Sequence, residues 1–197
     1  PRAFAAEAPV VFDALGEMRT IYTPQLVDEI LASGTRAIAV TVTDPKVETD
    51  KALAQTLADI EAYDRYYDAN AAQFIRTNKA ADVDRALAAR KIAVFYNLQN
   101  STPVEADLGQ IAKLRERGIT SIQLTYNDLN RSGAGCFVDD DPGITAFGRE
   151  MVARLEAERV LVDLSHGGMK TIAGAVVASK RPLIISHTAC KALWDHR

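Results

Sequence analysis

Six short, largely apolar runs alternate with helical stretches along this chain, and that alternation limits its fold more than any other feature. The runs are Val10–Leu15, Ala37–Thr43, Ile92–Leu98, Ser121–Tyr126, Val160–Ser165 and Pro182–Ser186. Runs that are apolar nearly throughout are typical of strands buried on both faces, as in a parallel sheet. We therefore interpret them as strands of one parallel sheet.

The stretches between these runs have helical character. They are Pro24–Ser33, Asp50–Ala72, Ala81–Arg90, Asp107–Arg117, Ala146–Glu158, Met169–Ser179 and a last helix that begins near Ala189. Gly34 and Gly118 are suited to end the helices that precede them, and Thr145 is suited to cap the start of another. Strand and helix in repeated alternation predict βαβ units of the α/β class.

Two α/β architectures accommodate such units. An open doubly wound sheet holds six of them, but the segment after the first run, Asp13–Glu17, reads D-A-L-G-E and lacks a G-x-G-x-x-G phosphate loop. A TIM-type (β/α)8 barrel requires eight units, and the last residues, Trp194–Arg197, lie within a helical pattern. We therefore predict that residues 1–197 form a single (β/α) barrel domain, truncated before its last two strands.

Composition excludes several classes of function. The chain is 48% hydrophobic and carries a net charge of -3, so it has no excess of basic residues that would indicate nucleic-acid binding. No apolar run in the sequence is long enough to span a membrane. Cys136 and Cys190 are too far apart to indicate a disulfide framework or a cysteine metal motif. The small-residue opening Pro1–Ala8 fits either the tail of a removed export signal or a natural end. The compartment, exported or periplasmic against cytoplasmic, therefore stays open.

Polar side chains stand at the carboxyl ends of the predicted strands, where barrel enzymes carry out their chemistry. His166 and His187 each follow a serine at the end of consecutive strands. A single histidine there is more often structural, but two converging neutral imidazoles favour a zinc site over that alternative. Asp163 either orients one of these histidines or caps a helix. His196 is interpreted as a surface residue.

Other catalytic patterns are weak. No G-x-S-x-G nucleophile motif is present, and neither cysteine lies beside a histidine in the sequence. The long loop 127–143 contains several glycines and the acidic run Asp139–Asp141. A loop of this length is either functional or a solvated surface excursion.

Three segments resemble the renal (membrane) dipeptidase family of zinc metallopeptidases. They are Asp141–Gly148 (D-P-G-I-T-A-F-G), Val160–His166 (V-L-V-D-L-S-H) and Arg181–His187 (R-P-L-I-I-S-H). The resemblance runs from about Val10 to the end and is strongest over residues 118–190. It implies a (β/α)8 barrel hydrolase with one or two zinc ions, in which a metal-activated water cleaves dipeptides or similar small amides. It also implies that His166 and His187 are zinc ligands and that a homodimer is possible.

The chain departs from the family at other ligand positions. Leu15 stands where the family has a histidine ligand, Glu17 where it has an aspartate, and Gln99 where it has a bridging glutamate. Tyr126 replaces a histidine that contacts the reaction intermediate, and its phenol can still donate a hydrogen bond to an oxyanion. The strand ends L-Q-N and L-T-Y-N resemble those of a bacterial branch. The predicted site residues are the catalytic Tyr126, the substrate-binding Tyr126 and Asn127, and the metal ligands His166, His187, Glu17 and Gln99.

Three interpretations remain. The first is a metallodipeptidase-like hydrolase acting on a small-molecule substrate. The second is a divergent non-peptidase enzyme with one metal or none, and the third is an inactive binding homologue. A fold alone does not choose among them, because one barrel supports many chemistries. The loss of two ligands argues against an ordinary two-zinc site, whereas both Ser-His strand ends argue against complete loss of function.

Overall fold

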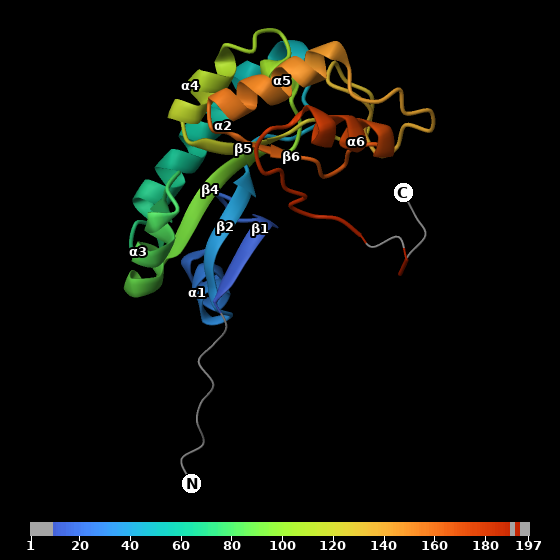
Figure 1. The fold of residues 1–197 in the computed structure, drawn as a ribbon. Coiled ribbons are helices and arrows are strands. Elements are labelled where there is room, and N and C mark those ends of the chain that lie inside the picture. The colour runs from blue at the N-terminus through green and yellow to red at the C-terminus, as the bar shows by residue number, and fades with distance from the viewer. Residues whose placement is uncertain (1–9, 190–191, 194–197) are drawn as a thin grey trace. The chain divides into compact units, whose positions relative to one another are not determined.

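The computed structural model describes residues 10–189 and 192–193 (Figure 1). The opening segment, Cys190, His196 and nearly all of the helix predicted from Ala189 lie outside these residues. The chain forms two compact units. The first comprises the described residues up to Val40 together with Ala62–Phe95, and the second comprises Thr41–Glu61 and the described residues from Tyr96 onward.

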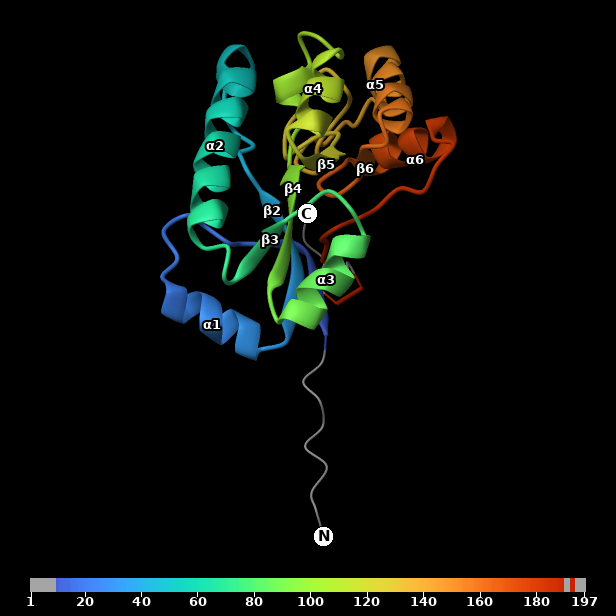
Figure 2. The same ribbon diagram turned by 90° about the vertical axis from the view of Figure 1, so that its left-hand side faces the viewer.

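The first unit is built on pairs of parallel strands. β1 (Val11–Gly16) pairs with β2 (Thr35–Thr41), and β3 (Phe74–Arg76) pairs with β4 (Ile92–Leu98). The helices of this part are α1 (Pro24–Ala32), the end of α2 (Thr49–Ala69) and α3 (Ala81–Ala89). Figure 2 shows α3 beside β3 and β4. Small side chains on both sides allow this close approach, because a cluster of buried alanines fills the contact: Ala37, Ala86 and Ala93.

The second unit carries the rest of the sheet, whose strand order is β1-β2-β4-β5-β6 with β3 paired to β4. The end of β4 pairs with β5 (Ile119–Gln123), and β5 pairs with β6 (Leu161–Asp163), all parallel. A short 3-10 helix, η1 (Thr102–Val104), follows β4; the α-helices are α4 (Gln110–Glu116), α5 (Ala146–Ala157) and α6 (Met169–Ala178). Figure 1 shows α4 and α5 along one side of β5 and β6, where fully buried side chains form the core: Ile111, Leu114, Met151 and Leu155.

Helix ends follow the predicted signals. Gly34 and Gly118 adopt φ angles of 97° and 103°, the left-handed backbone that glycine allows after a helix. Thr145 caps α5, since its hydroxyl accepts the backbone N–H of Gly148 at 2.9 Å. These three predictions are confirmed.

The predicted strands differ from the structure in two places. β3 was not predicted, because three residues are too few to carry a periodic signal. The run Pro182–Ser186 is not a strand; one parallel bridge between Asp163 and Ile184 joins it to β6. Pro182 lacks the N–H that a ladder needs, which limits pairing at the start of this run.

Asp141, the last residue of the acidic run, holds the start of α6. The residue is 7% exposed, and its carboxylate accepts the N–H groups of Lys170 at 2.6 Å and Thr171 at 2.9 Å. It also accepts the Thr171 hydroxyl at 2.8 Å and the N–H of Gly143 at 2.7 Å. The N-cap residue of α6 is Gly168, which has no side chain, so Asp141 supplies the acceptor that the free N–H groups of the first turn require. This part of the long loop is therefore structural.

The anchoring by Asp141 predicts a loss of stability at acid pH. Burial raises the pKa of this carboxyl, but the hydrogen bonds from Thr171, Gly143 and Lys170 outweigh burial and hold the pKa below its ordinary value. A carboxyl with a depressed folded-state pKa contributes stability above its unfolded pKa and loses it as the pH falls through the folded pKa. We expect Asp141→Asn to lower the free energy of unfolding by about 1–3 kcal/mol near neutral pH and to flatten its decline in acid, measured by urea unfolding. The exposed neighbour provides the control: Asp140→Asn should keep the decline of the unaltered protein.

Candidate functional site

The two predicted histidines lie side by side in the second unit. His166 follows β6, and His187 follows the segment that is bridged to β6. The parallel bridge between Asp163 and Ile184 aligns the two segments, so both histidines lie at the same edge of the sheet. Their ring centroids are 4.8 Å apart, with an angle of 60° between the ring planes. His166 adopts a positive φ of 60°, which is uncommon for a residue with a side chain and is found at functional sites.

Each imidazole is held through its Nδ1 atom. Nδ1 of His166 lies 2.7 Å from Oδ1 of Asn127, an oxygen that can only accept, so this nitrogen carries the proton and donates. Nδ1 of His187 lies 2.9 Å from the hydroxyl of Ser186. Nε2 of His187 is buried and has no hydrogen-bond partner among the described residues. Both rings are thus fixed on one side, and Nε2 is the atom left for a ligand.

Both imidazoles are biased toward the neutral form. Burial lowers the pKa of His166, and the neighbouring His187 lowers it further, while Asp163 opposes these effects. Burial likewise lowers the pKa of His187 against the opposing effect of Asp163. Neutral imidazole is the form that binds metal ions, so the environment favours metal binding.

Asp163 supports His187 through Ser186. The residue is 3% exposed, and its carboxylate accepts the Ser186 hydroxyl at 2.5 Å and the backbone N–H groups of Ser165 and Ser186. The Ser186 hydroxyl in turn contacts Nδ1 of His187. Of the two roles considered for Asp163, these contacts favour orientation of a histidine over capping of a helix.

Tyr126 and Asn127 also lie at His166. The Tyr126 ring stacks on the His166 ring at 4.4 Å between centroids and 28° between planes. Asn127 accepts from His166, so its contact with the site is a hydrogen bond that positions the imidazole. The predicted catalytic and substrate-binding residues are therefore placed beside the histidine pair.

The other two predicted ligands have different partners. Gln99 donates from Nε2 to the Thr41 hydroxyl at 2.8 Å, and its backbone oxygen accepts from Gln123. Glu17 belongs to the first unit, where it is exposed and pairs with Arg19. Within the described ranges, no group of three or more His, Cys, Asp or Glu residues is arranged to hold a metal ion.

These observations define how well the residues fit zinc. Two neutral imidazoles with Nε2 available are suitable nitrogen ligands for one ion. A two-metal centre fits poorly, because Leu15 has no ligand atom and Gln99 brings a neutral amide where a bridging carboxylate is expected. The described residues thus fit part of a one-metal site.

Two residues near His166 were missed by the sequence reasoning. The Cys136 sulfur lies 3.9 Å from Nδ1 of His166 and 3.6 Å from Oδ1 of Asn127. Burial raises the pKa of the Cys136 thiol. Gly135 packs so tightly that a Cβ there would overlap the backbone of Tyr126 and Asn127. Spacing in sequence gave no sign of either contact; the paired glycines of G-A-G-C were the only signal.

Residues 21–197 match the family described as membrane dipeptidase (peptidase family M19). The chain belongs to this family. The predicted resemblance to renal dipeptidase is therefore confirmed, and the two Ser-His pairs described above lie within the matched segment of the membrane dipeptidase family.

The chain is also similar to curated relatives and to solved structures. An uncharacterized dipeptidase of Schizosaccharomyces pombe is 29% identical over 110 residues, which are 54% of this chain and 26% of the yeast protein. An amidohydrolase structure from Pseudomonas aeruginosa has a TM-score of 0.87 and 28% identity, and covers 95% of this chain and 55% of that chain. A metallopeptidase structure from Rhodobacter sphaeroides, liganded with a phosphinate mimic of the dipeptide L-Ala-D-Ala, has a TM-score of 0.82 at 17% identity, with coverages of 94% and 67%.

The structural likeness confirms the predicted α/β barrel class. This chain spans about a quarter of the yeast relative and just over half of the Pseudomonas protein, so activity and substrate are matters for proposal. None of the helices in the described ranges combines the length and apolar character that crossing a bilayer requires.

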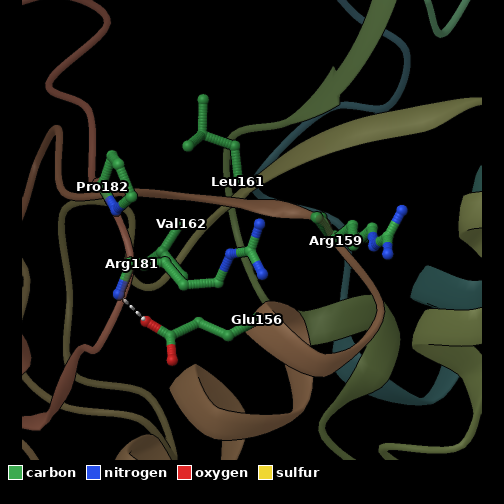
Figure 3. Close-up of a pocket in the computed structure, with 7 residues that line it drawn as sticks. Glu156, Arg159, Leu161, Val162, Arg181 and Pro182 are labelled. Carbon is green, nitrogen blue, oxygen red and sulfur yellow. Dashed lines mark hydrogen bonds between the residues drawn. The ribbon is translucent and has the colours of Figure 1, made fainter.

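Two hollows in the second unit differ in their relation to the site. One, of about 240 Å³, is lined by Glu156, Arg159, Arg181 and the start of β6 (Figure 3). Figure 3 shows the Glu156 carboxylate hydrogen-bonded to the backbone N–H of Arg181, a contact that fixes the loop after α6. Because this hollow lies at the amino end of β6, it is remote from the histidines at the carboxyl end. The other, of about 530 Å³, is lined in part by Tyr126 and therefore adjoins them.

Proposed function

We propose that this chain is part of a hydrolase of dipeptides or similar small amides, in which His166 and His187 bind one zinc ion. The observation that carries the proposal is the adjacent pair of imidazoles, each held at Nδ1, with the buried Nε2 of His187 lacking a partner among the described residues. Membership of the membrane dipeptidase family supports the reaction class.

The residues around the pair have distinct roles in this proposal. Zinc bound there would supply a water molecule of lowered pKa as the nucleophile. Tyr126 would donate its phenolic hydrogen to the oxyanion that develops on the scissile carbonyl. Asn127 would hold the His166 tautomer with Oδ1 and offer its amide nitrogen to the substrate. Gln99 is a weak candidate to complete the ligand shell, because a neutral amide does not offset the charge of the ion.

A second candidate is a non-peptidase enzyme or a binding protein with one metal or none. It is favoured by the amide at Gln99, which hydrogen-bonds to Thr41 and brings no charge. Loss of a charged ligand weakens metal binding and favours an altered reaction on the same scaffold.

Metal content and peptide hydrolysis together test the proposed function. We expect about one zinc per chain after dialysis against zinc, measured by elemental analysis, because the two imidazoles supply part of the ligand shell of one ion. We also expect the protein to hydrolyse members of a panel of dipeptides, measured as the release of free amino acids. A chelator should abolish the activity and added zinc should restore it. The proposal would be overturned in favour of the second candidate if the protein retains no zinc after dialysis and also hydrolyses no dipeptide when zinc is in excess.

A further inference from the structure

The cleft of about 530 Å³ beside Tyr126 has no role in the proposed chemistry. Its walls come from the loops that follow β2, β4 and β5, at the carboxyl ends of these strands. Tyr126 forms part of the lining and stacks on His166 with the same ring. A group bound in the cleft would therefore lie next to the histidine site.

Glu105 is a buried carboxyl in the lining of this cleft. The residue is 4% exposed. One oxygen, Oε1, accepts two long hydrogen bonds of 3.3 Å, from the Ser101 hydroxyl and the Arg131 backbone N–H. No hydrogen bond to Oε2 is present among the described residues, although an ionised carboxylate accepts up to about four. The carboxyl therefore retains capacity for a donor.

Glu105 takes part in no ion pair within the described part of the chain, although the positive charge of Arg131 is close enough to act on its pKa. The Arg131 guanidinium donates to the Glu105 backbone oxygen and stacks over the Phe147 ring at 3.9 Å. Glu48 at the rim is paired with Lys51. Burial raises the pKa of Glu105, against the opposing effects of Arg131 and Ser101. An unpaired buried carboxyl is costly, and a bound cation relieves that cost.

We propose that this cleft binds a substrate side chain that ends in an ammonium or guanidinium group, and that Glu105 receives that group. The apolar side chains of Val47 and Leu129 in the lining suit the methylene stem of a lysine or arginine. The charged head of such a side chain would reach the open oxygen of Glu105 and form a charge-assisted hydrogen bond. This inference rests on the proposed function only in that it calls the bound molecule a substrate. Binding in the cleft can be measured without hydrolysis.

Free amino acids test the cleft without any bond to cleave. L-Lysine and L-norleucine share a four-carbon stem and differ by the terminal ammonium. We expect L-lysine to bind the unaltered protein about tenfold more tightly than L-norleucine, measured by isothermal titration calorimetry. Glu105→Gln keeps the shape of the side chain and should remove about that tenfold preference, leaving L-norleucine binding unchanged. Glu150→Gln, on the exposed surface of α5 and outside the lining of the cleft, should leave both affinities unchanged.

Equal binding of the two amino acids to the unaltered protein would overturn the inference, and this comparison stands if Glu105→Gln fails to fold. A lysine preference that survives in Glu105→Gln would also overturn it. Lysine selectivity without peptide hydrolysis would reject the proposed function and support the cleft. Hydrolysis without lysine selectivity would support the proposed function and reject the inference about the cleft.

Discussion

Replacing His187 with alanine should weaken zinc binding by roughly a hundredfold or more, since even residues that only support a ligand contribute ten- to a hundredfold. The side chain presents a buried Nε2 without a partner in the described structure, beside the ring of His166. Removing it leaves a single imidazole, which does not retain an ion against dialysis. Zinc titration with a competing chromophoric chelator measures the affinity directly. Thr188→Ala alters the exposed next residue and should bind zinc as the unaltered protein does.

Stability separates a lost ligand from a damaged fold. Without metal, Nε2 of His187 is an unsatisfied buried atom, so its removal relieves a desolvation cost and offsets part of the packing that is lost. We therefore expect metal-free His187→Ala and the metal-free unaltered protein to unfold at similar temperatures. Added zinc should raise the unfolding temperature of the unaltered protein alone, because a ligand stabilises the state that binds it. Equal stabilisation of both proteins by zinc would contradict the assignment of His187.

The histidine pair could be predicted from sequence because two regular features determine its position. His166 follows the end of β6, and His187 follows a run that one parallel bridge joins to β6, in the same Ser-His frame. The capping signals at Gly34, Gly118 and Thr145 are equally local and were read correctly. Where a strand is three residues long, as in β3, the signal is too short to detect.

The surroundings of the pair depend on the long loop, which has no periodic pattern. The loop folds back so that the Gly135 N–H bonds to the Asp128 oxygen, and Gly135 forms an antiparallel bridge with Gly167. That return places Cys136 beside His166. It depends on tertiary packing, which spacing along a single sequence does not report. The cleft at Glu105 was missed for the same reason, since three separate loops line it.

Gly135→Ala should be the most destabilising small substitution at this site. A Cβ at Gly135 would meet the backbone oxygen of Tyr126 and the backbone of Asn127 well inside the 3.0 Å that real Cβ contacts respect. These neighbours are backbone atoms held by hydrogen bonds, including Phe137 N–H to the Asn127 oxygen at 2.9 Å, so they cannot rotate away. Overpacking of this kind costs about 3 kcal/mol, measured as the loss in free energy of urea unfolding.

The same displacement should reach the histidine site. Tyr126 stacks on His166 and Asn127 fixes its tautomer, so a shift of their backbone disturbs both contacts. We expect the surviving folded Gly135→Ala protein to bind zinc about tenfold more weakly, because Asn127 supports a ligand. At Gly109 the nearest atom to an added Cβ is the end of the exposed Asp107 side chain, which can shift although it accepts the Gly109 N–H. Gly109→Ala should therefore cost far less stability than Gly135→Ala and should leave the zinc affinity unchanged. Should Gly135→Ala match Gly109→Ala in both measurements, the packing of the long loop against the site would be wrong.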